Sequence, residues 1–502
     1  MVLLRKFPYK YFDYEVELMR REMNLLFPDA IIEDSKCGIV GTGIQKEQIS
    51  MLDQLTYIKS FEYEGQNKYT LQAKLESTSN DANKRNKQQT RYSTNGLHEY
   101  KGKFNPQLVH SIINILGIKK GMSVIDPFCG SGTTLLECQH MGILSKGTDI
   151  NPLAVFIANA KISSLTMDIT HACKVLGKIA NYVSSPKELE FDDSSERIIY
   201  LKKWLPIDIL ATLEGVRIML DKEHEVIANF FKVMLSNLIR EYSFQEPSDL
   251  RIRKRFSSFP ETSLADVFLV NAQKQLKQIS LTQELIGRQD VLNCAVNGDI
   301  RTDISGIIEN TFDAAITSPP YATALPYIDT QRLSLVWLGL CTPKDIMKLE
   351  SSLIGSREMY NEVKKLWNTA IISNENKLPI EVVDMIGEMQ TSISSSDGFR
   401  KQAMPTLLYR YFADMKTMFL NMTNVLRANA YFVLVVGHNK TTLGEKAFHI
   451  HTPDLLATIA MATGWEVDEK LPLQTYQRYG LNSKNSINSE TLLILRNARA
   501  RR

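Results

Sequence analysis

Residues 123–149 follow a pattern that admits few folds. A short apolar strand ends in Asp126, a turn with two glycines follows, then a helix, then a second strand that ends in Asp149. Gly130 and Gly132 let the backbone approach a ligand closely, and the start of the helix offers free N–H groups. This alternation predicts a doubly wound α/β fold with a parallel sheet and a ligand site at its carboxyl edge.

The alternation stops near residue 163, resumes near residue 295 and is interrupted again. Long stretches of helical periodicity fill both gaps. Residues 76–95 are almost wholly polar, so we expect a linker that buries no core. The predicted segments are an N-terminal region with its linker (1–95), three parts of the core (96–162, 291–331 and 401–502) and two helical insertions (163–290 and 332–400).

Composition narrows the class of protein. Six cysteines in 502 residues, with no CxxC pair and scattered histidines, indicate a reducing compartment and no metal site. The chain has no run of 18 apolar residues, and its start lacks the apolar core of a signal peptide, so we expect a cytoplasmic protein without a membrane partner. The net charge of +3 neither favours nor excludes nucleic acid.

The glycine turn is more selective than an ordinary strand–helix turn. Thr133 and Thr134 follow Gly132, so the third glycine of a dinucleotide site is missing. A nucleoside without pyrophosphate therefore fits better. Asp149 can accept bonds from both ribose hydroxyls, and Asp299, at a later strand end, can contact an adenine amino group.

A second constellation follows the apolar strand at 312–317, which runs directly into Ser318-Pro319-Pro320-Tyr321. Two prolines fix two φ angles and remove two N–H donors, so backbone carbonyls can point outward. The serine adds a hydroxyl acceptor and the tyrosine a flat face. This set suits a planar ring with an exocyclic amino group, although Pro-Pro alone would indicate only a rigid turn.

Together these motifs resemble the amino-methylating (cytosine-N4/adenine-N6) DNA methyltransferases, which use S-adenosylmethionine. Residues 126–133 resemble the family's cofactor loop, and residues 318–321 its catalytic tetrapeptide. Residues 98–106 and 485–496 resemble two further family segments. The resemblance implies a Rossmann-like methyltransferase sheet. It also implies a set of cofactor-binding residues: Phe104, Asp126, Phe128, Gly130, Gly132, Thr133, Asp149 and Asp299.

The first residue of the tetrapeptide bears on the target base. In this family Ser usually accompanies the 4-amino group of cytosine, and Asp or Asn accompanies adenine, so Ser318 favours cytosine-N4 with adenine-N6 as the alternative. The implied mechanism flips the base and transfers the methyl group directly, with Ser318 and Pro319 orienting the amino group and Pro320 and Tyr321 completing the turn. Methylation at cytosine C5 is set aside, because none of the 17 prolines precedes a cysteine.

The partners follow from the resemblance and from one basic run. Arg251, Arg253, Lys254 and Arg255 suit phosphate contact on a loop, although a solvated face is the alternative. The cofactor loop precedes the catalytic tetrapeptide, and a long insertion separates them. This order resembles that of family members whose target-recognition region lies between the two motifs, so the insertion at 163–290 is favoured over 332–400 for reading the target. Double-stranded DNA and, from the family's biology, a cognate restriction endonuclease are the implied partners. Methylation of tRNA guanine and a non-catalytic subunit remain alternatives.

Overall fold

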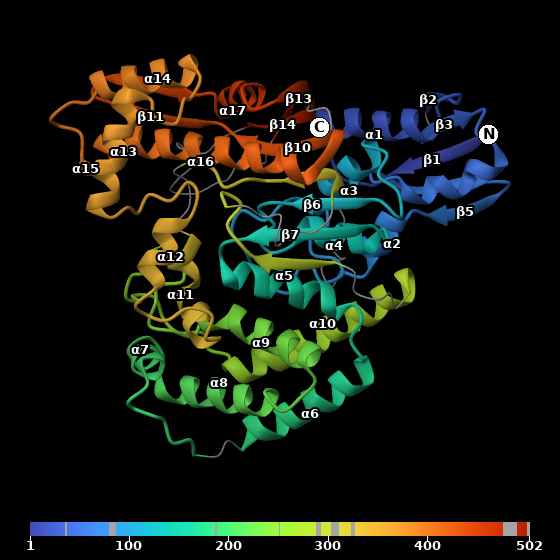
Figure 1. Cartoon of the computed structure of the whole chain (residues 1–502). Helices are drawn as coiled ribbons and strands as arrows, with labels where there is room; N and C mark the ends of the chain where they lie inside the picture. Colours follow the sequence, from blue (N-terminus) through green and yellow to red (C-terminus); the bar gives the residue numbers. More distant parts are fainter. Residues whose placement is uncertain are drawn as a thin grey trace.

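The computed structural model describes all residues except 36–37, 80–86, 186–187, 250, 288–292, 303–310, 323–326, 475–488 and 499–502. Its centre is a seven-stranded sheet with the order β13-β14-β10-β9-β6-β7-β8 (Figure 1). The strands are β6 (Ser123–Asp126), β7 (Leu144–Asp149), β8 (Cys294–Asn297), β9 (Phe312–Thr317), β10 (Leu426–Gly437), β13 (Trp465–Gln474) and β14 (Ser489–Asn497). Only β14 runs antiparallel to its neighbours among these strands. The expected Rossmann-like α/β fold is confirmed.

Apolar side chains on both faces of the sheet explain why it lies between two layers of helices. In β10, Val433 and Val435 join one buried cluster, whereas Leu434 and Val436 join another. The first cluster includes residues of α1 (Asp13–Leu26), α3 (Pro106–Ile115) and α4 (Thr133–His140). The second includes residues of α16 (Met404–Val425) and α17 (Thr452–Met461). Because successive residues of a strand point to opposite faces of the sheet, apolar residues of the same strand pack against both helix layers.

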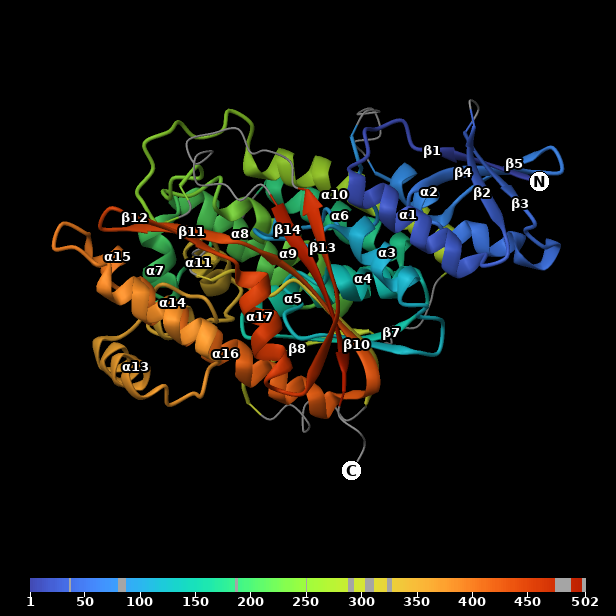
Figure 2. The ribbon, with the colours of Figure 1, turned by 90° about the horizontal axis from the view of Figure 1, so that it is seen from above.

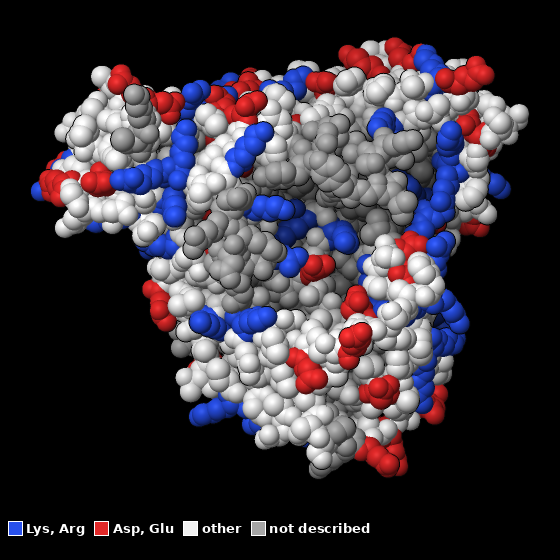
Figure 3. Space-filling model, turned by 180° about the vertical axis from the view of Figure 1, so that it is seen from behind, with Lys and Arg blue, Asp and Glu red and all other residues white. Residues whose placement is uncertain are grey.

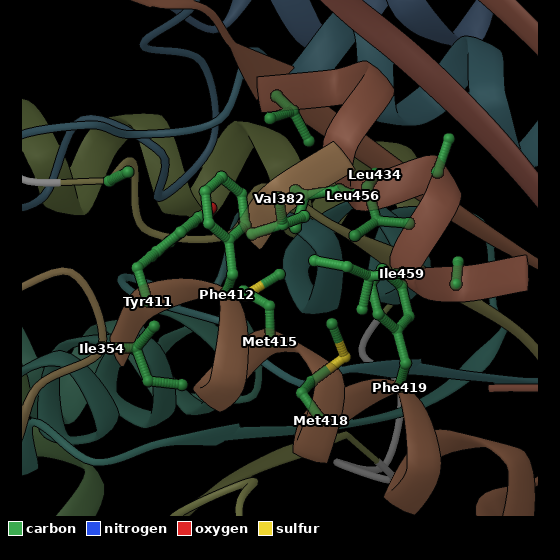
Figure 4. Packing of buried hydrophobic residues seen from close by; sticks show 14 of the residues in the cluster. Ile354, Val382, Tyr411, Phe412, Met415, Met418, Phe419, Leu434, Leu456 and Ile459 are labelled. Carbon is green, nitrogen blue, oxygen red and sulfur yellow. The ribbon is translucent and has the colours of Figure 1, made fainter. Parts of the chain in front are cut away.

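Helix α16 is the centre of the second cluster. Apolar residues recur along it at helical spacing, so one broad face is buried. Figure 4 shows these side chains meeting Leu434 of β10 and Leu456 and Ile459 of α17. The labelled members from α16 are Tyr411, Phe412, Met415, Met418 and Phe419.

The first helical insertion lies below the sheet in Figure 1 and packs on α5 (Pro152–Ser164). It consists of α6 (Ile169–Ser184), α7 (Glu196–Trp204), α8 (Ile207–Leu220), α9 (Glu225–Ile239) and α10 (Leu264–Ile286). Its apolar residues form a cluster with α11 and with the face of α5 that points away from the sheet. The insertion therefore has its own core and still contacts the sheet domain.

The second insertion divides between two neighbours. Its helices are α11 (Tyr327–Trp337), α12 (Ile346–Ser352), α13 (Asn361–Ser373), α14 (Ile380–Thr391) and α15 (Phe399–Gln402). Helix α11 packs on α7 and α9 of the first insertion, whereas α13 and α14 pack on α16. Figure 2 shows the hairpin of β11 (Asn439–Leu443) and β12 (Lys446–Ile450) near α14 and α15. The two insertions thus meet at α11.

The N-terminal region is a second, antiparallel sheet with the order β2-β3-β1-β4-β5. Its elements besides α1 are β1 (Val2–Lys6), β2 (Ile31–Ser35), β3 (Gly38–Thr42), the 3-10 helix η1 (Lys46–Gln54), β4 (Ile58–Tyr63), β5 (Gln66–Tyr69) and α2 (Leu71–Ser77). Leu4, Leu18 and Tyr57 belong to the same cluster as Val109 and Ile112 of α3. The region is therefore continuous with one layer of the central sheet.

The prediction of a linker without a core at 76–95 is wrong in its described part. Tyr92, Ser93 and Asn95 are fully or almost fully buried. Gln278 Nε2 donates to the carbonyl of Ser93 (2.5 Å), and Asn95 Nδ2 donates to Glu137 Oε1 (3.0 Å). Polar residues can be buried when the protein itself supplies their hydrogen-bond partners. Here those partners lie in α10 and α4, far away in the sequence.

In the part of the chain that the structure describes, no helix combines the length and apolar character needed to cross a membrane.

Candidate cofactor and substrate site

A small cavity lies where the carboxyl ends of β6 and β9 meet. It brings the glycine turn and the proline turn, which are far apart in the sequence, to one edge of the sheet. The lining residues are Tyr100, Gly102, Lys103, Phe104, Asp126, Phe128, Cys129, Gly130, Ser131, Thr133 and Ser318. Five predicted cofactor residues and the first residue of the tetrapeptide therefore share one cavity. Gly132, Asp149 and Asp299 do not line it.

Each glycine of the turn has its own structural reason. Both have positive φ, +48° for Gly130 and +77° for Gly132. A Cβ on Gly130 would lie 3.3 Å from the Tyr100 ring, so this glycine keeps room in the cavity. A Cβ on Gly132 would lie 2.7 Å from the Ala158 Cβ, so this glycine lets the start of α4 approach α5.

Asp126 ties the two turns together. Its Oδ1 accepts from Thr317 Oγ1 (2.6 Å) and from the backbone N–H of Phe128 (3.1 Å). Burial raises the pKa of Asp126 to about 6, against the opposing effect of its hydrogen bonds. Because Thr317 immediately precedes Ser318, this bond fixes the proline turn relative to the glycine turn.

Asp149 lies beneath the glycine turn. Its Oδ2 accepts from the N–H of Gly130 and its Oδ1 from the N–H of Asn151, both at 2.9 Å. Burial raises the pKa of Asp149 to about 6. Each carboxylate oxygen has more than one acceptor site, so capacity remains for ribose hydroxyls.

Asp299 is held away from the cavity by a cation. Its carboxylate is paired with Arg301 (2.7 Å), and Arg301 also contacts Asp414 (3.2 Å). This pairing lowers the pKa of Asp299 in spite of burial, which acts in the opposite direction. A contact to an adenine amino group would compete with the guanidinium, so the structure does not join Asp299 to the other predicted residues.

The proline turn presents one free acceptor and one fixed ring. Ser318 Oγ lies 3.5 Å from the carbonyl oxygen of Val435, a long contact. The Tyr321 hydroxyl donates to Glu490 on β14. Burial, followed by the charge of Glu490, raises the pKa of Tyr321 well above its usual value, so the hydroxyl stays protonated. The Tyr321 ring fits against Gly437, where a Cβ would lie only 3.0 Å from it.

Sequence reasoning missed several polar and aromatic residues around the cavity. Tyr100 stacks on Tyr327, with ring centroids 6.5 Å apart. Lys103 Nζ donates to the carbonyl of Asn95 (2.8 Å), and burial lowers its pKa to about 7. Lys161 is fully buried and donates to the carbonyl of Ser131 (3.0 Å). The segment at 98–106 could have indicated Tyr100 and Lys103, whereas Lys161 lies inside a helix with no sequence signal.

The predicted basic run does not form a single surface. The Arg255 guanidinium donates to the carbonyls of Ser243 and Ser258, each at 2.8 Å, and to that of Glu241. Its donors are therefore used within its own loop. Arg253 pairs with Asp249 at 3.4 Å, but its side chain remains 66% exposed. Lys254 pairs through its backbone with Gln245.

Comparison with known proteins agrees with this geometry. A family model for N6 and N4 methyltransferases, described as DNA methylase, matches residues 45–160. The Type II methyltransferase M.BsoBI of Geobacillus stearothermophilus is 27% identical over 296 residues, 53% of this chain and 57% of that protein. M.MjaII of Methanocaldococcus jannaschii is 34% identical over 162 residues, 31% of this chain and 30% of that protein. M.MvaI of Kocuria varians is 23% identical over 347 residues, which are 61% of this chain and 74% of that protein.

These matches show that the chain is similar to amino-methylating DNA methyltransferases, most directly over residues 45–160. They also imply S-adenosylmethionine as the methyl donor. The chain spans 57% of the length of the first relative and 30% of the second.

The residues at the cavity fit this cofactor. Ser131 is buried, and its hydroxyl has no hydrogen-bond partner among the described residues. A buried hydroxyl that the protein leaves unpaired is expected to bond a ligand or water. Phe104 and Tyr100 offer apolar surface, and Asp149, which does not line the cavity itself, is bonded to the lining residue Gly130.

Proposed function

We propose that the chain transfers a methyl group from S-adenosylmethionine to the exocyclic 4-amino group of a flipped cytosine in double-stranded DNA. The observation that carries this proposal is that Ser318 lines the same cavity as the cofactor loop. S-adenosylmethionine supplies an electrophilic methyl group when bound. The relatives are named as Type II methyltransferases, which supports DNA as the substrate and a restriction–modification context with a cognate endonuclease.

The residues of the turn would act by position. The Ser318 hydroxyl points toward the carbonyl of Val435, so its lone pairs are free to accept an amino N–H. The carbonyl of Pro319 would accept the second N–H. Tyr321, kept protonated by burial and by the charge of Glu490, which raise its pKa, would support the base ring. Because the reaction forms no covalent enzyme intermediate, its rate would depend on orientation and on acceptors for the charge that develops on the amino group.

The surface suits a polyanionic substrate. Figure 3 shows Lys and Arg side chains around a hollow between the broad upper part of the molecule and the lower helical part. Cations around a concave surface favour phosphate backbones. The first insertion, which carries Arg251 and Arg253, is our candidate for target recognition.

The test uses purified protein, tritiated S-adenosylmethionine and unmethylated bacterial genomic DNA, with total RNA in a parallel reaction. Labelled nucleosides are separated by chromatography. We expect label in 4-methylcytosine, and a rate about 100-fold lower for Ser318→Ala, because one positioned hydrogen bond is removed. The affinity for S-adenosylhomocysteine should stay within about twofold, since Ser318 is proposed to bind the base.

The exposed Ser77→Ala, at the end of α2, is the matched control and should leave the rate unchanged. Label in 6-methyladenine would support the transfer and overturn the choice of base. Label only in RNA, or none in either reaction, would overturn the proposal for DNA.

A further inference from the structure

The loop between α9 and α10, described at residues 243–249 and 251–258, is held together by two charged side chains, Glu246 and Arg255. The Glu246 carboxylate accepts from the Ser248 hydroxyl (2.6 Å) and from the backbone N–H groups of Ser248, Phe256 and Ser257, each at 3.2 Å. Arg255 donates to three carbonyls, as described above. Backbone bonds from Glu246 to Arg253 (2.9 Å) and from Arg255 to Phe244 (2.7 Å) close the loop. We refer to it as the 243–258 loop.

These hydrogen bonds fix the backbone of Phe256, whose aromatic side chain is exposed to solvent. Phe256 is 73% exposed, although its own N–H is bound to buried Glu246. Single exposed apolar residues are common on protein surfaces. Phe256 differs because its backbone is fixed and because its neighbours are cationic. Arg253, three residues earlier, is largely exposed, and Arg251, two residues before it, is partly exposed.

The 243–258 loop is attached close to the cavity. Gln245 Nε2 donates to the carbonyl of Asp329 at the start of α11 (3.3 Å). Two residues earlier, Tyr327 stacks on Tyr100, which lines the cavity. Arg251 also lies near Arg357 of the second insertion, and its charge contributes to lowering the pKa of Arg357 after burial. The two insertions therefore bring two cations close to each other.

We propose that Phe256 enters the base stack of the DNA duplex next to the flipped base, while Arg251 and Arg253 contact the flanking phosphates. This proposal rests on the proposed function. Base flipping costs a few kcal/mol, and an aromatic ring that fills or wedges the stack offsets part of that cost. A preorganised loop suits this role, because a wedge is effective only if it does not fold back when the duplex presses on it.

The first experiment measures unwinding. A nicked plasmid is ligated in the presence of the protein and S-adenosylhomocysteine, and the change in linking number is read from the topoisomers. We expect the wild type to shift the topoisomer distribution at saturating protein, and Phe256→Ala to lose most of that shift. Phe256→Trp should restore it, because the position requires a flat ring.

The second experiment measures methylation of unmethylated genomic DNA by the same variants. We expect Phe256→Ala to reduce the rate about tenfold, in line with the loss of one base–aromatic contact, and to keep the affinity for S-adenosylhomocysteine within about twofold. Phe399→Ala is the matched control, because Phe399 is 75% exposed and also lies beside an arginine, Arg400. It should behave as the wild type in both assays.

The outcomes separate this proposal from the proposed function. If the wild type methylates DNA and Phe256→Ala matches it in rate and in topoisomer shift, the wedge is wrong and the enzyme assignment stands. If the wild type methylates no DNA, the proposed function fails; a shift that depends on Phe256 would then still support insertion into the stack. An equal loss in Phe399→Ala would overturn a specific role for Phe256.

Discussion

Two glycines with nearly equal φ allow the stability cost of backbone strain to be distinguished from the cost of steric crowding. Gly132 has φ +77° and Gly65, in the turn between β4 and β5, has φ +75°. A Cβ on Gly65 would meet nothing within 4 Å, whereas one on Gly132 would meet Ala158. We expect Gly65→Ala to cost about 1–2 kcal/mol of unfolding free energy from strain alone.

Gly132→Ala should cost more, because α4 must also move away from α5. It should weaken S-adenosylhomocysteine binding, while Gly65→Ala should not. Urea unfolding followed by circular dichroism and calorimetric titration measure the two effects. Equal stability losses in the two variants would show that α4 and α5 are not in the close contact described.

Asp149 predicts how cofactor binding changes with pH. Because burial raises its folded pKa to about 6, its carboxyl contributes stability below the unfolded pKa, and that stability is lost as the pH rises through 6. The predicted contact of Asp149 with the ribose hydroxyls of the cofactor would need the opposite form, the carboxylate. Affinity for S-adenosylhomocysteine should therefore fall about tenfold between pH 8 and pH 5, since about one-tenth of the groups with a pKa of 6 are ionised at pH 5.

Calorimetric titration across this pH range is the measurement, with Asp149→Asn as the comparison. The variant should bind more weakly at pH 8 and show a flatter pH dependence. Asp126 also has a pKa near 6, so the variant is needed to attribute the change. An unchanged pH profile in Asp149→Asn would exclude this carboxylate as the origin.

At the level of elements, α16 offers adjacent residues with opposite environments. Phe419 is fully buried between Phe432 and Trp465, whereas Leu420 is 36% exposed. We expect Phe419→Ala to lower the unfolding free energy by about 3–5 kcal/mol, because it leaves a cavity in a close-packed core. Leu420→Ala should cost less than about 1 kcal/mol. Urea unfolding of both variants tests this, and similar losses would contradict the orientation of α16.

Local signals account for the elements that the sequence predicted. The strand, glycine turn and helix at 123–140 are encoded by adjacent residues, and so is the turn at 318–321. The burial of Ser93 and Asn95 could not be predicted, because Gln278 and Glu137 supply their partners from other elements. The hydrogen bonds of Arg255 within its loop and of Glu490 with Tyr321 were missed for the same reason. A charged side chain is expected to be exposed when its partners lie elsewhere in the sequence.

At the scale of the whole molecule, the N-terminal sheet shares a core with the central sheet. Arg21 of α1 binds both carboxylate oxygens of Glu469 on β13, at 2.5 and 2.7 Å. Leu18 and Met19 pack in the same cluster as Val109 of α3. We expect a variant that lacks residues 1–79 to aggregate or to lose cooperative unfolding, because it exposes one face of the remaining core.

Size-exclusion chromatography and thermal unfolding measure this outcome. Arg21→Ala is the matched control, since it removes the ion pair and keeps the apolar contact. That pair is partly exposed, so its loss should cost only about 1 kcal/mol. A truncated chain that is monomeric and unfolds cooperatively would show that the N-terminal region is a separate domain.

The ion pair between Arg21 and Glu469 also sets an order of events during synthesis. The two residues are 448 positions apart. At roughly 5–20 residues per second, a ribosome needs on the order of 20–90 s to make the second after the first. During that interval α3 emerges and can cover part of the apolar side of α1, but the contact of α1 with β13 cannot form. The packing of the first helix against the central sheet is therefore completed only when the last strands emerge.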